Sequence, residues 1–311
     1  MSFPPLVLVS QAHRSGGSLM AQLFDDHPEL YAHPFEIHIG HPDKWLWPDL
    51  DLAASPETWF ERLFERKLER YVQHGFAKAG HNVHAVTDRR RFDIDLGRMR
   101  ELFLAEASAL GRPSQRAILD AYFRSFFGAW RDWHASGRER WLTGFTPFTI
   151  TVASSVGRLG RDYPDGRIIT LVRDPRSWRV SCRTHDRFLH GDLDRSVGIW
   201  RQSAECSLAL ARHNPDRVLL ATYERLVTET EATMRRVATF LGVEFLPTLL
   251  RPTFLGRELR PNSSFAVAQY GINQDGVDRS DQLDEAERTA IDREAMPLYE
   301  EIEAFVAARS R

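Results

Sequence analysis

Three short apolar runs, each followed by a turn and a helical pattern, constrain the fold of this chain most strongly. They cover residues 6–10, 167–172 and 218–223, and all three have the length of strands. Short runs of apolar and β-branched residues are typical of strands in a parallel sheet that is covered on both faces. Strands that alternate with helices predict an α/β fold, a three-layer sandwich with a mainly parallel central sheet.

A helical block separates the first strand–helix unit from the later ones. Apolar residues recur in it at spacings of three and four, as at Trp59, Phe60 and Leu63, which is the period of an amphipathic helix. We therefore predict a single domain over residues 1–311, in which residues 40–135 form a helical insertion. The sequence has no internal repeat or linker that would divide it further.

Three more elements are predicted outside this pattern. Residues 83–87 have the composition of a short strand inside the insertion. A helix over residues 229–241 is expected to end at Gly242, a usual helix-ending residue. Residues 284–308 predict one amphipathic helix, which Pro297 is expected to kink.

The composition is that of an ordinary soluble protein. The formal net charge is −2 over 311 residues, so we expect no nucleic-acid partner and no general attraction to anionic membranes. Two cysteines, Cys182 and Cys206, stand in no metal-type spacing and fit a reducing compartment. The first apolar run is too short for a signal peptide or a membrane span. We therefore expect a cytoplasmic protein without a membrane span.

The turn after the first strand has the composition of an anion site. It reads Arg14-Ser15-Gly16-Gly17-Ser18, and its glycines let backbone N–H groups point inward while the arginine adds positive charge. The lysine of an ATP-binding GxxxxGK[ST] loop is missing. Alone, the turn predicts a P-loop-like phosphate site, and a plain Ser/Gly turn with an exposed arginine fits equally well.

Residues 14–19 resemble the phosphosulfate loop of sulfotransferases that use 3′-phosphoadenosine-5′-phosphosulfate (PAPS). That loop reads roughly (K/R)-S-G-(T/S)-(T/S)-(L/W), and this chain fits it through Leu19 except at Gly17. Residues 23–28 (LFDDHP) resemble the LxxHP that follows the loop in the carbohydrate and tyrosylprotein branches. The resemblance implies that PAPS binds here through residues 14–19.

The strand–helix junction at Arg173 carries the second part of the resemblance. Arg173-Asp174-Pro175-Arg176 and Ser181 match the family's 3′-phosphate motif RxPxxxxxS, with eight residues from Arg173 to Ser181. An arginine at a strand end can fork onto phosphate oxygens. The same residues also have the pattern of an N-capped helix with proline at its first position. The two interpretations are compatible.

Two later segments agree with the same family. Residues 223–226 (YERL), followed by FLG at residues 240–242, resemble its YEdL…FLG, which implies that Tyr223 lies near the adenine. Residues 262–265 (NSSF) resemble a bacterial loop that closes over the nucleotide, which implies contacts from Asn262 and Ser263. The resemblance implies a metal-independent enzyme that transfers the sulfuryl group of PAPS to a hydroxyl of a sugar, lipid or small natural product. The product nucleotide is PAP, and the insertion would be the acceptor-binding lid.

The resemblance also implies roles within the loop. Arg14, with the amides of Gly16 to Leu19, would stabilise the oxygen that departs with PAP. Ser18 would reach the 5′-phosphate, and Ser15 would hold the loop or touch the sulfuryl group. These assignments leave the base for the acceptor hydroxyl to be found elsewhere.

Glu36 is the expected base, since it follows Arg14 by 22 residues, as a glutamate does in tyrosylprotein-type members. Partial burial would raise its pKa toward neutrality, as an efficient base requires. His33 and Asp88 are the alternatives, and an ordinary solvated glutamate remains open. The histidines near Glu36, at positions 33, 38 and 41, match no usual zinc spacing, so no metal is expected.

One departure from the family stands at Phe145. Many members have a lysine there, in a motif like GxKTP, whereas residues 144–148 read GFTPF. Arg179, Arg183 and His185 are the candidates to replace that lysine. If none does, the chain is a catalytically weakened nucleotide-binding protein, and a phosphotransferase with an atypical P-loop is the other alternative. The sequence leaves the acceptor and the oligomeric state open.

Overall fold

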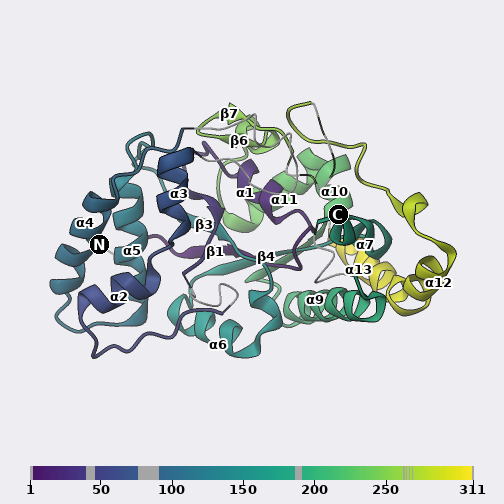
Figure 1. The fold of residues 1–311 in the computed structure, drawn as a ribbon, viewed down its shortest axis with the longest axis horizontal. Helices are drawn as coiled ribbons and strands as arrows, with labels where there is room; N and C mark the ends of the chain where they lie inside the picture. Colours follow the sequence, from purple (N-terminus) through teal and green to yellow (C-terminus); the bar gives the residue numbers. More distant parts are fainter. Residues whose placement is uncertain are drawn as a thin grey trace.

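A five-stranded, wholly parallel sheet forms the centre of the protein, with helices on both faces (Figure 1). The computed structural model describes residues 3–39, 46–75, 91–185, 191–261, 263, 265, 267 and 269–309. The strand order is β2-β3-β1-β4-β5. The strands are β1 (Leu6–Val9), β2 (Leu30–Glu36), β3 (Trp141–Phe145), β4 (Arg167–Val172) and β5 (Val218–Thr222). Since β1 is central, its carboxyl end opens at the middle of the sheet edge, where ligands bind in open α/β folds.

Alternation along β1 explains why both faces of the sheet are covered. Val7 and Val9 pack into one apolar cluster, whereas Leu6 and Leu8 pack into another on the opposite face, as the two-residue period of a strand requires. All four side chains are buried. The first face is covered by α1 (Gly17–Leu23), α10 (Tyr223–Thr228) and α11 (Thr230–Leu241).

Helices from the C-terminal half cover the other face beside β4 and β5. They are α6 (Ala153–Asp162), α7 (Pro175–His185), α9 (Leu193–His213), α12 (Glu285–Glu294) and α13 (Met296–Ala308). Trp178 of α7 and Trp200 of α9 are buried in this layer. The three layers confirm the predicted α/β sandwich with its parallel sheet.

Between β2 and β3 the described residues form four helices, which lie to the left of the sheet in Figure 1. They are α2 (Pro56–Leu63), α3 (Lys67–His74), α4 (Leu96–Ser108) and α5 (Gln115–Ala129). Aromatic side chains of these helices pack with Leu6, Leu8 and Leu142 of the sheet in one continuous core. Most of the predicted insertion is thus a structural layer of the domain, and its role as an acceptor lid stays a prediction.

Several predicted elements need correction. The helix expected over residues 284–308 is two helices, α12 and α13, which meet at Ala295, just before Pro297. Strands β2 and β3, and a short antiparallel hairpin of β6 (Thr253–Phe254) and β7 (Arg257–Glu258), were not predicted. The strand expected at residues 83–87 lies outside the described residues. Helix α11 ends at Gly242 as predicted, with φ of 66° at that glycine.

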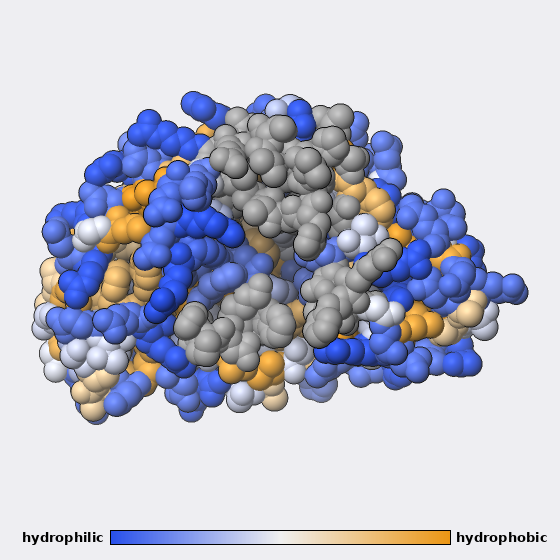
Figure 2. Space-filling model, in the orientation of Figure 1, coloured by the Kyte–Doolittle hydropathy of each residue, from blue (hydrophilic) through white to orange (hydrophobic). Residues whose placement is uncertain are grey.

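Short 3-10 turns complete the described structure at Thr149–Thr151, Pro247–Leu250 and Ser280–Gln282. No helix in the described ranges is long and apolar enough to cross a membrane. Hydrophilic residues dominate the face shown in Figure 2, and its hydrophobic residues lie in separate patches.

Candidate active site

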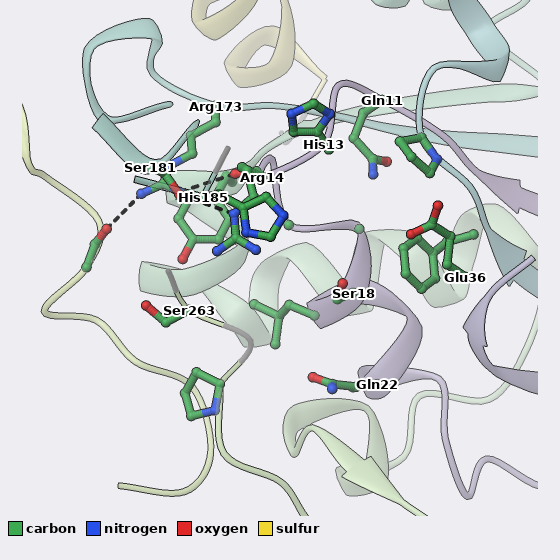
Figure 3. Close-up of a pocket in the computed structure, with 18 of the residues that line it drawn as sticks. Gln11, His13, Arg14, Ser18, Gln22, Glu36, Arg173, Ser181, His185 and Ser263 are labelled. Carbon is green, nitrogen blue, oxygen red and sulfur yellow. Dashed lines mark hydrogen bonds between the residues drawn. The ribbon is translucent and has the colours of Figure 1, made fainter. Parts of the chain in front are cut away.

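A cavity of about 400 Å³ opens above the carboxyl ends of the strands, a size typical of nucleotide and small-molecule sites. One end is lined by the loop after β1, Arg173, the second half of α7, Tyr223 and the segment that precedes α12. We call it the nucleotide end. The other is lined by the carboxyl ends of β2 and β3 and by α3, and we call it the acceptor end. Figure 3 shows part of the lining from both ends.

The loop after β1 has a constrained backbone. Arg14 has a positive φ of 64° and Gly16 one of 99°, values that are unfavourable for most side chains. A Cβ atom at Gly16 would lie 2.8 Å from the ring of Tyr223, so the loop needs a glycine there to approach that ring. The indole N–H of Trp178 holds the loop by donating to the carbonyl of His13 at 2.8 Å.

Three arginines converge at the nucleotide end. Burial, with a smaller contribution from the neighbouring Arg173, lowers the pKa of Arg14 to about 10. Burial also lowers the pKa of Arg279, again with a contribution from Arg173. Guanidinium groups repel one another when they are desolvated together, and a bound polyanion relieves that repulsion. The arrangement is therefore suited to a ligand with several phosphates.

Arg173 is fixed on three sides, but one of its donors is unused. It donates to the carbonyls of Arg14 at 3.2 Å and of Gly276 at 2.9 Å, and its guanidinium lies 4.4 Å from the centre of the Tyr223 ring. Its buried Nε has no hydrogen-bond partner among the described residues. Buried donors are normally paired, so this one is suited to bind an anionic ligand.

Ser181 lies two turns into α7 and meets the loop across the cavity. Its hydroxyl accepts a hydrogen bond from Nε of Arg14 at 3.3 Å (Figure 3). The two residues are 167 positions apart in the chain, and both line the cavity. The junctions after β1 and β4 thus form one site, as the paired motifs predict.

A buried carboxylate supports the nucleotide end from behind. Glu224 accepts from the backbone N–H of Asp174 at 3.1 Å and from the hydroxyl of Tyr299 at 2.8 Å. Burial raises the pKa of Glu224 to about 7, against the opposing effect of these hydrogen bonds. The start of α7 is therefore anchored by a carboxyl group that titrates near neutrality.

Glu36 is the only carboxylate among the described residues that line the cavity. It ends β2, and its backbone pairs with Phe145 of β3. Its side chain is 26% exposed, and its Oε1 lies 3.5 Å from Nε2 of His38. Burial lowers the pKa of His38, which favours a neutral imidazole beside the carboxylate. Lys67, Arg70 and Tyr71 of α3 line the same end.

Glu65 joins the acceptor end to the helical insertion. Its carboxylate accepts from the backbone N–H of His38 at 2.7 Å and lies 3.1 Å from Nζ of Lys67 and 3.3 Å from Nε2 of His33. Burial alone would raise the pKa of Glu65, but Lys67, His33 and the His38 N–H outweigh burial and lower it to about 2. Glu65 thus fixes the end of β2 against α3.

Most of the predicted site residues lie together around the cavity. The lining includes ten of them: Arg14, Gly16, Gly17, Ser18, Leu19, Glu36, Arg173, Ser181, Tyr223 and Ser263. Ser15 is buried and does not line the cavity. His33 is fully buried against Glu65, also away from the lining. Asn262 and Asp88 lie outside the described residues.

Phe145 also lines the cavity, so the lysine of the resembling enzymes is replaced at the site itself. Arg179 and Arg183 both pair with Glu287 outside the cavity. Of the three candidates to replace that lysine, only His185 is part of the lining. Figure 3 shows its ring beside Arg14 and Ser181.

The sequence patterns did not identify Gln11, Arg279 and Lys67 as site residues, although all three line the cavity. Gln11 directly follows the first strand, and a polar residue at that position was a usable signal. Arg279 lies about 100 residues after Arg173 and belongs to no recognised motif. Lys67 reaches the cavity because it pairs with Glu65 and because α3 packs against the site. No local sequence pattern predicts either contact.

A model of the sulfotransferase family matches residues 5–247. The chain belongs to the sulfotransferase family. The matched residues include the loop, Glu36, Phe145, Arg173 and Tyr223, and therefore most of both ends of the cavity. No curated protein matches the chain significantly.

Two solved sulfotransferase domains share the fold at low sequence identity. The domain from the curacin biosynthetic pathway has a TM-score of 0.52 at 17% identity, over 94% of this chain and 98% of its own. The domain of the olefin synthase of Synechococcus PCC 7002 has a TM-score of 0.54 at 19% identity, over 91% and 90%. At identities this low, the similarity shows a shared fold only. The reaction must be inferred from the residues of the site.

Among the described residues, no three His, Cys, Asp or Glu side chains are grouped as metal ligands. The charged groups of the cavity are instead three arginines at one end, and a lysine, an arginine and a glutamate at the other. Chemistry that these residues support is anion binding at the nucleotide end and proton transfer at the acceptor end.

Proposed function

We propose that this sulfotransferase-family protein transfers the sulfuryl group of PAPS to a hydroxyl of a small molecule or glycan. The observation that carries the proposal is the convergence of Arg14 and Arg173 from separate strand–helix junctions, with the Nε of Arg173 unpaired. PAPS has phosphates at both its 5′ and 3′ positions, so it needs two anion sites joined by a nucleoside site. Tyr223 contacts both, with its ring centre 4.4 Å from the Arg173 guanidinium and its ring edge against Gly16 of the loop, and it would lie near the adenine.

The residues at the two ends would act on opposite sides of the transferred group. Glu36 takes the proton of the acceptor hydroxyl while the new O–S bond forms. Arg14 stabilises the phosphate oxygen that receives the electron pair as its bond to sulfur breaks. Arg14 keeps its proton at a pKa of about 10, so it acts by charge alone. The products are a sulfate ester and PAP.

The acceptor end favours an acceptor with an apolar body and an acidic group. Phe35 and Tyr71 provide aromatic surface, and Arg70 reaches the cavity with no carboxylate partner among the described residues. His185 and Lys67 are further cationic or titratable groups of the lining. These groups support a working enzyme despite the loss of the usual lysine.

The nucleotide assignment is tested by calorimetric titration of PAP in the absence of Mg²⁺. We expect PAP to bind the wild type, and Arg173→Ala to weaken it by about 10- to 100-fold, the usual effect of losing charged hydrogen bonds. Arg167→Ala is the matched control, because Arg167 lies at the other end of β4 and stacks 4.9 Å from the centre of the Trp141 ring. Preference for Mg·ATP over PAP would instead indicate a phosphotransferase.

The reaction is tested by incubating the protein with PAPS and a panel of hydroxyl compounds, aliphatic, phenolic and glycosidic. Formation of a sulfate ester together with PAP in equal amounts is the expected result. PAP binding without turnover by any alcohol would support the alternative of a weakened, nucleotide-binding member of the family.

A further inference from the structure

Gln11 is a buried polar side chain that the mechanism above leaves unused. Its residue is only 2% exposed, yet it lines the cavity. Its buried Oε1 has no hydrogen-bond partner among the described residues. A buried carboxamide atom without a partner is costly, so a native site normally supplies one, and exchange of Oε1 and Nε2 by rotation would place a donor at this position. For a cavity-lining side chain, the available partner is the ligand.

The absence of a side chain at Gly17 makes room for Gln11. A Cβ atom at Gly17 would lie 2.1 Å from Nε2 and 3.1 Å from Cδ of Gln11. The next nearest atom is Cδ2 of Phe145, at 3.3 Å. The Gln11 carboxamide therefore fills the space that a side chain at position 17 would occupy. It also brings a hydrogen-bonding group to a point of the loop that has no hydroxyl of its own.

Gln11 stands between the two ends of the cavity. It follows β1, whose neighbours are β3, with Phe145, and β4, with Arg173 beyond its end. Glu36 ends β2, two strand spacings or about 10 Å from β1. Figure 3 shows the Gln11 carboxamide pointing into the space among Arg14, Ser18 and Glu36. That space is where the transferred group must lie if Arg14 and Glu36 act as proposed.

We propose that Gln11 binds the sulfuryl group directly, with its carboxamide N–H donating to a sulfuryl oxygen. This rests on the proposed function and adds a residue to it. Rotation of the carboxamide about its terminal bond exchanges Oε1 and Nε2, so the side chain can present either atom to the ligand. Gln11 exchanges no proton or electron pair. It orients the sulfur between the acceptor oxygen and the departing phosphate oxygen, and it offsets the charge on the sulfuryl oxygens.

The test compares the affinities of PAPS and PAP, which differ by the sulfuryl group, and it needs no acceptor. Calorimetric titration of Gln11→Ala should show PAPS affinity lowered about tenfold and PAP affinity unchanged, as for one hydrogen bond to a charged group. Gln11→Glu should weaken PAPS at least as much, since it places a carboxylate against the anionic sulfuryl group. Gln22→Ala is the matched control, a second glutamine of the lining whose loss should leave the PAPS-to-PAP ratio unchanged.

A second pair of variants tests the packing argument. Gly17→Ser should weaken PAPS strongly, because its Cβ displaces Gln11. The double variant Gln11→Ala/Gly17→Ser should recover at least half of that loss, since the serine then occupies the vacated space and offers a hydroxyl. Equal effects of Gly17→Ser in both backgrounds would contradict the coupling.

The outcomes separate this inference from the proposed function. If the wild-type protein binds neither PAP nor PAPS, the proposed function is refuted. The role of Gln11 as a sulfuryl contact is then refuted as well. If the wild type binds both nucleotides and both Gln11 variants keep its ratio of PAPS affinity to PAP affinity, only the role of Gln11 is refuted. An equal loss of PAP and PAPS in Gln11→Ala, accompanied by a lower melting temperature, would show a merely structural side chain and would also overturn the inference.

Discussion

The two ends of the cavity are built in different ways. The nucleotide end is built mainly from residues that follow strands, namely Arg14 in the loop after β1, Arg173 directly after β4 and Tyr223 directly after β5, and Arg279 joins them from the segment before α12. The acceptor end takes Glu36 from β2, but Lys67, Arg70 and Tyr71 come from a helix of the insertion. The nucleotide end thus follows mostly from the sheet, whereas the acceptor end depends on how α3 is held against it.

The buried carboxylates of the two ends differ in the same way. Glu65 at the acceptor end is paired with Lys67 and has its pKa lowered to about 2. Glu224 at the nucleotide end accepts hydrogen bonds from a backbone N–H and a tyrosine hydroxyl, and burial raises its pKa to about 7 although Arg173 acts to lower it. The acceptor end is thus stabilised by charge pairing, and the nucleotide end by a carboxyl group that titrates near neutrality.

The sharpest difference between the ends is expected for Glu36→Gln. Removing the base should lower kcat about 1,000-fold, within the usual range for general bases, and leave PAP affinity within twofold of wild type. Glutamine has nearly the same shape, so the fold should be kept. The measurement is single-turnover sulfate transfer together with PAP calorimetry.

Two results would contradict the assignment of Glu36. Near-normal turnover would mean that another group is the base, and a parallel loss of PAP binding would mean that the two ends are not independent. Glu29→Gln is a useful control, because Glu29 lies just before β2, pairs with Arg140 and does not line the cavity.

A smaller effect, on stability, is expected for Glu65→Gln. Lys67 would then lose the buried carboxylate that lies 3.1 Å from its Nζ, and breaking such a pair costs about 3 kcal/mol. The free energy of unfolding, measured by urea denaturation, should fall by that amount at pH 7. Because the folded pKa of about 2 lies below the ordinary 4.5, this stabilisation is present above pH 4.5 and is lost as the pH falls from there toward 2.

Removing Lys67 as well gives the control for charge pairing. The double variant Glu65→Gln/Lys67→Met should cost less than the sum of the two single variants, since no unpaired charge is left buried. Strict additivity would show that the pair contributes nothing. PAP affinity should stay near the wild-type value in all three proteins if the nucleotide end is independent of α3.

The smallest effect on stability is expected for Glu224→Gln. Its pH dependence is opposite to that of Glu65, because the pKa of Glu224 is raised and that of Glu65 is lowered. The folded pKa of about 7 lies above the ordinary 4.5, so wild-type stability should fall as the pH rises from about 4.5 to 7. The variant lacks this titration, and its stability relative to wild type should increase by about 2 kcal/mol between pH 5 and pH 8. Urea denaturation at the two pH values measures it, and parallel pH profiles for the two proteins would disprove the assignment.

Local patterns predicted the parallel sheet and the nucleotide end. The apolar runs at β1, β4 and β5 have strand length, and a site residue next to a strand in sequence stays next to it in space. Strands β2 and β3 were missed. Residues 30–36 contain Glu, His and Pro among their apolar positions, and β3 is a short run with Thr143 and Gly144 inside it that follows a long helical block.

The sequence by itself determined the fold class, and it predicted that the loop with Arg14 meets Arg173 and Ser181, because each motif lies at a strand–helix junction. Only the tertiary structure decided how the rest of the site is assembled. Glu65 finds Lys67, His33 and the end of β2 through packing of the insertion, Arg279 reaches Arg173 from about 100 residues away, and Gln11 fills the space beside Gly17. For these contacts, the distance between the residues in space cannot be inferred from their separation in the chain. No local sequence pattern predicts them.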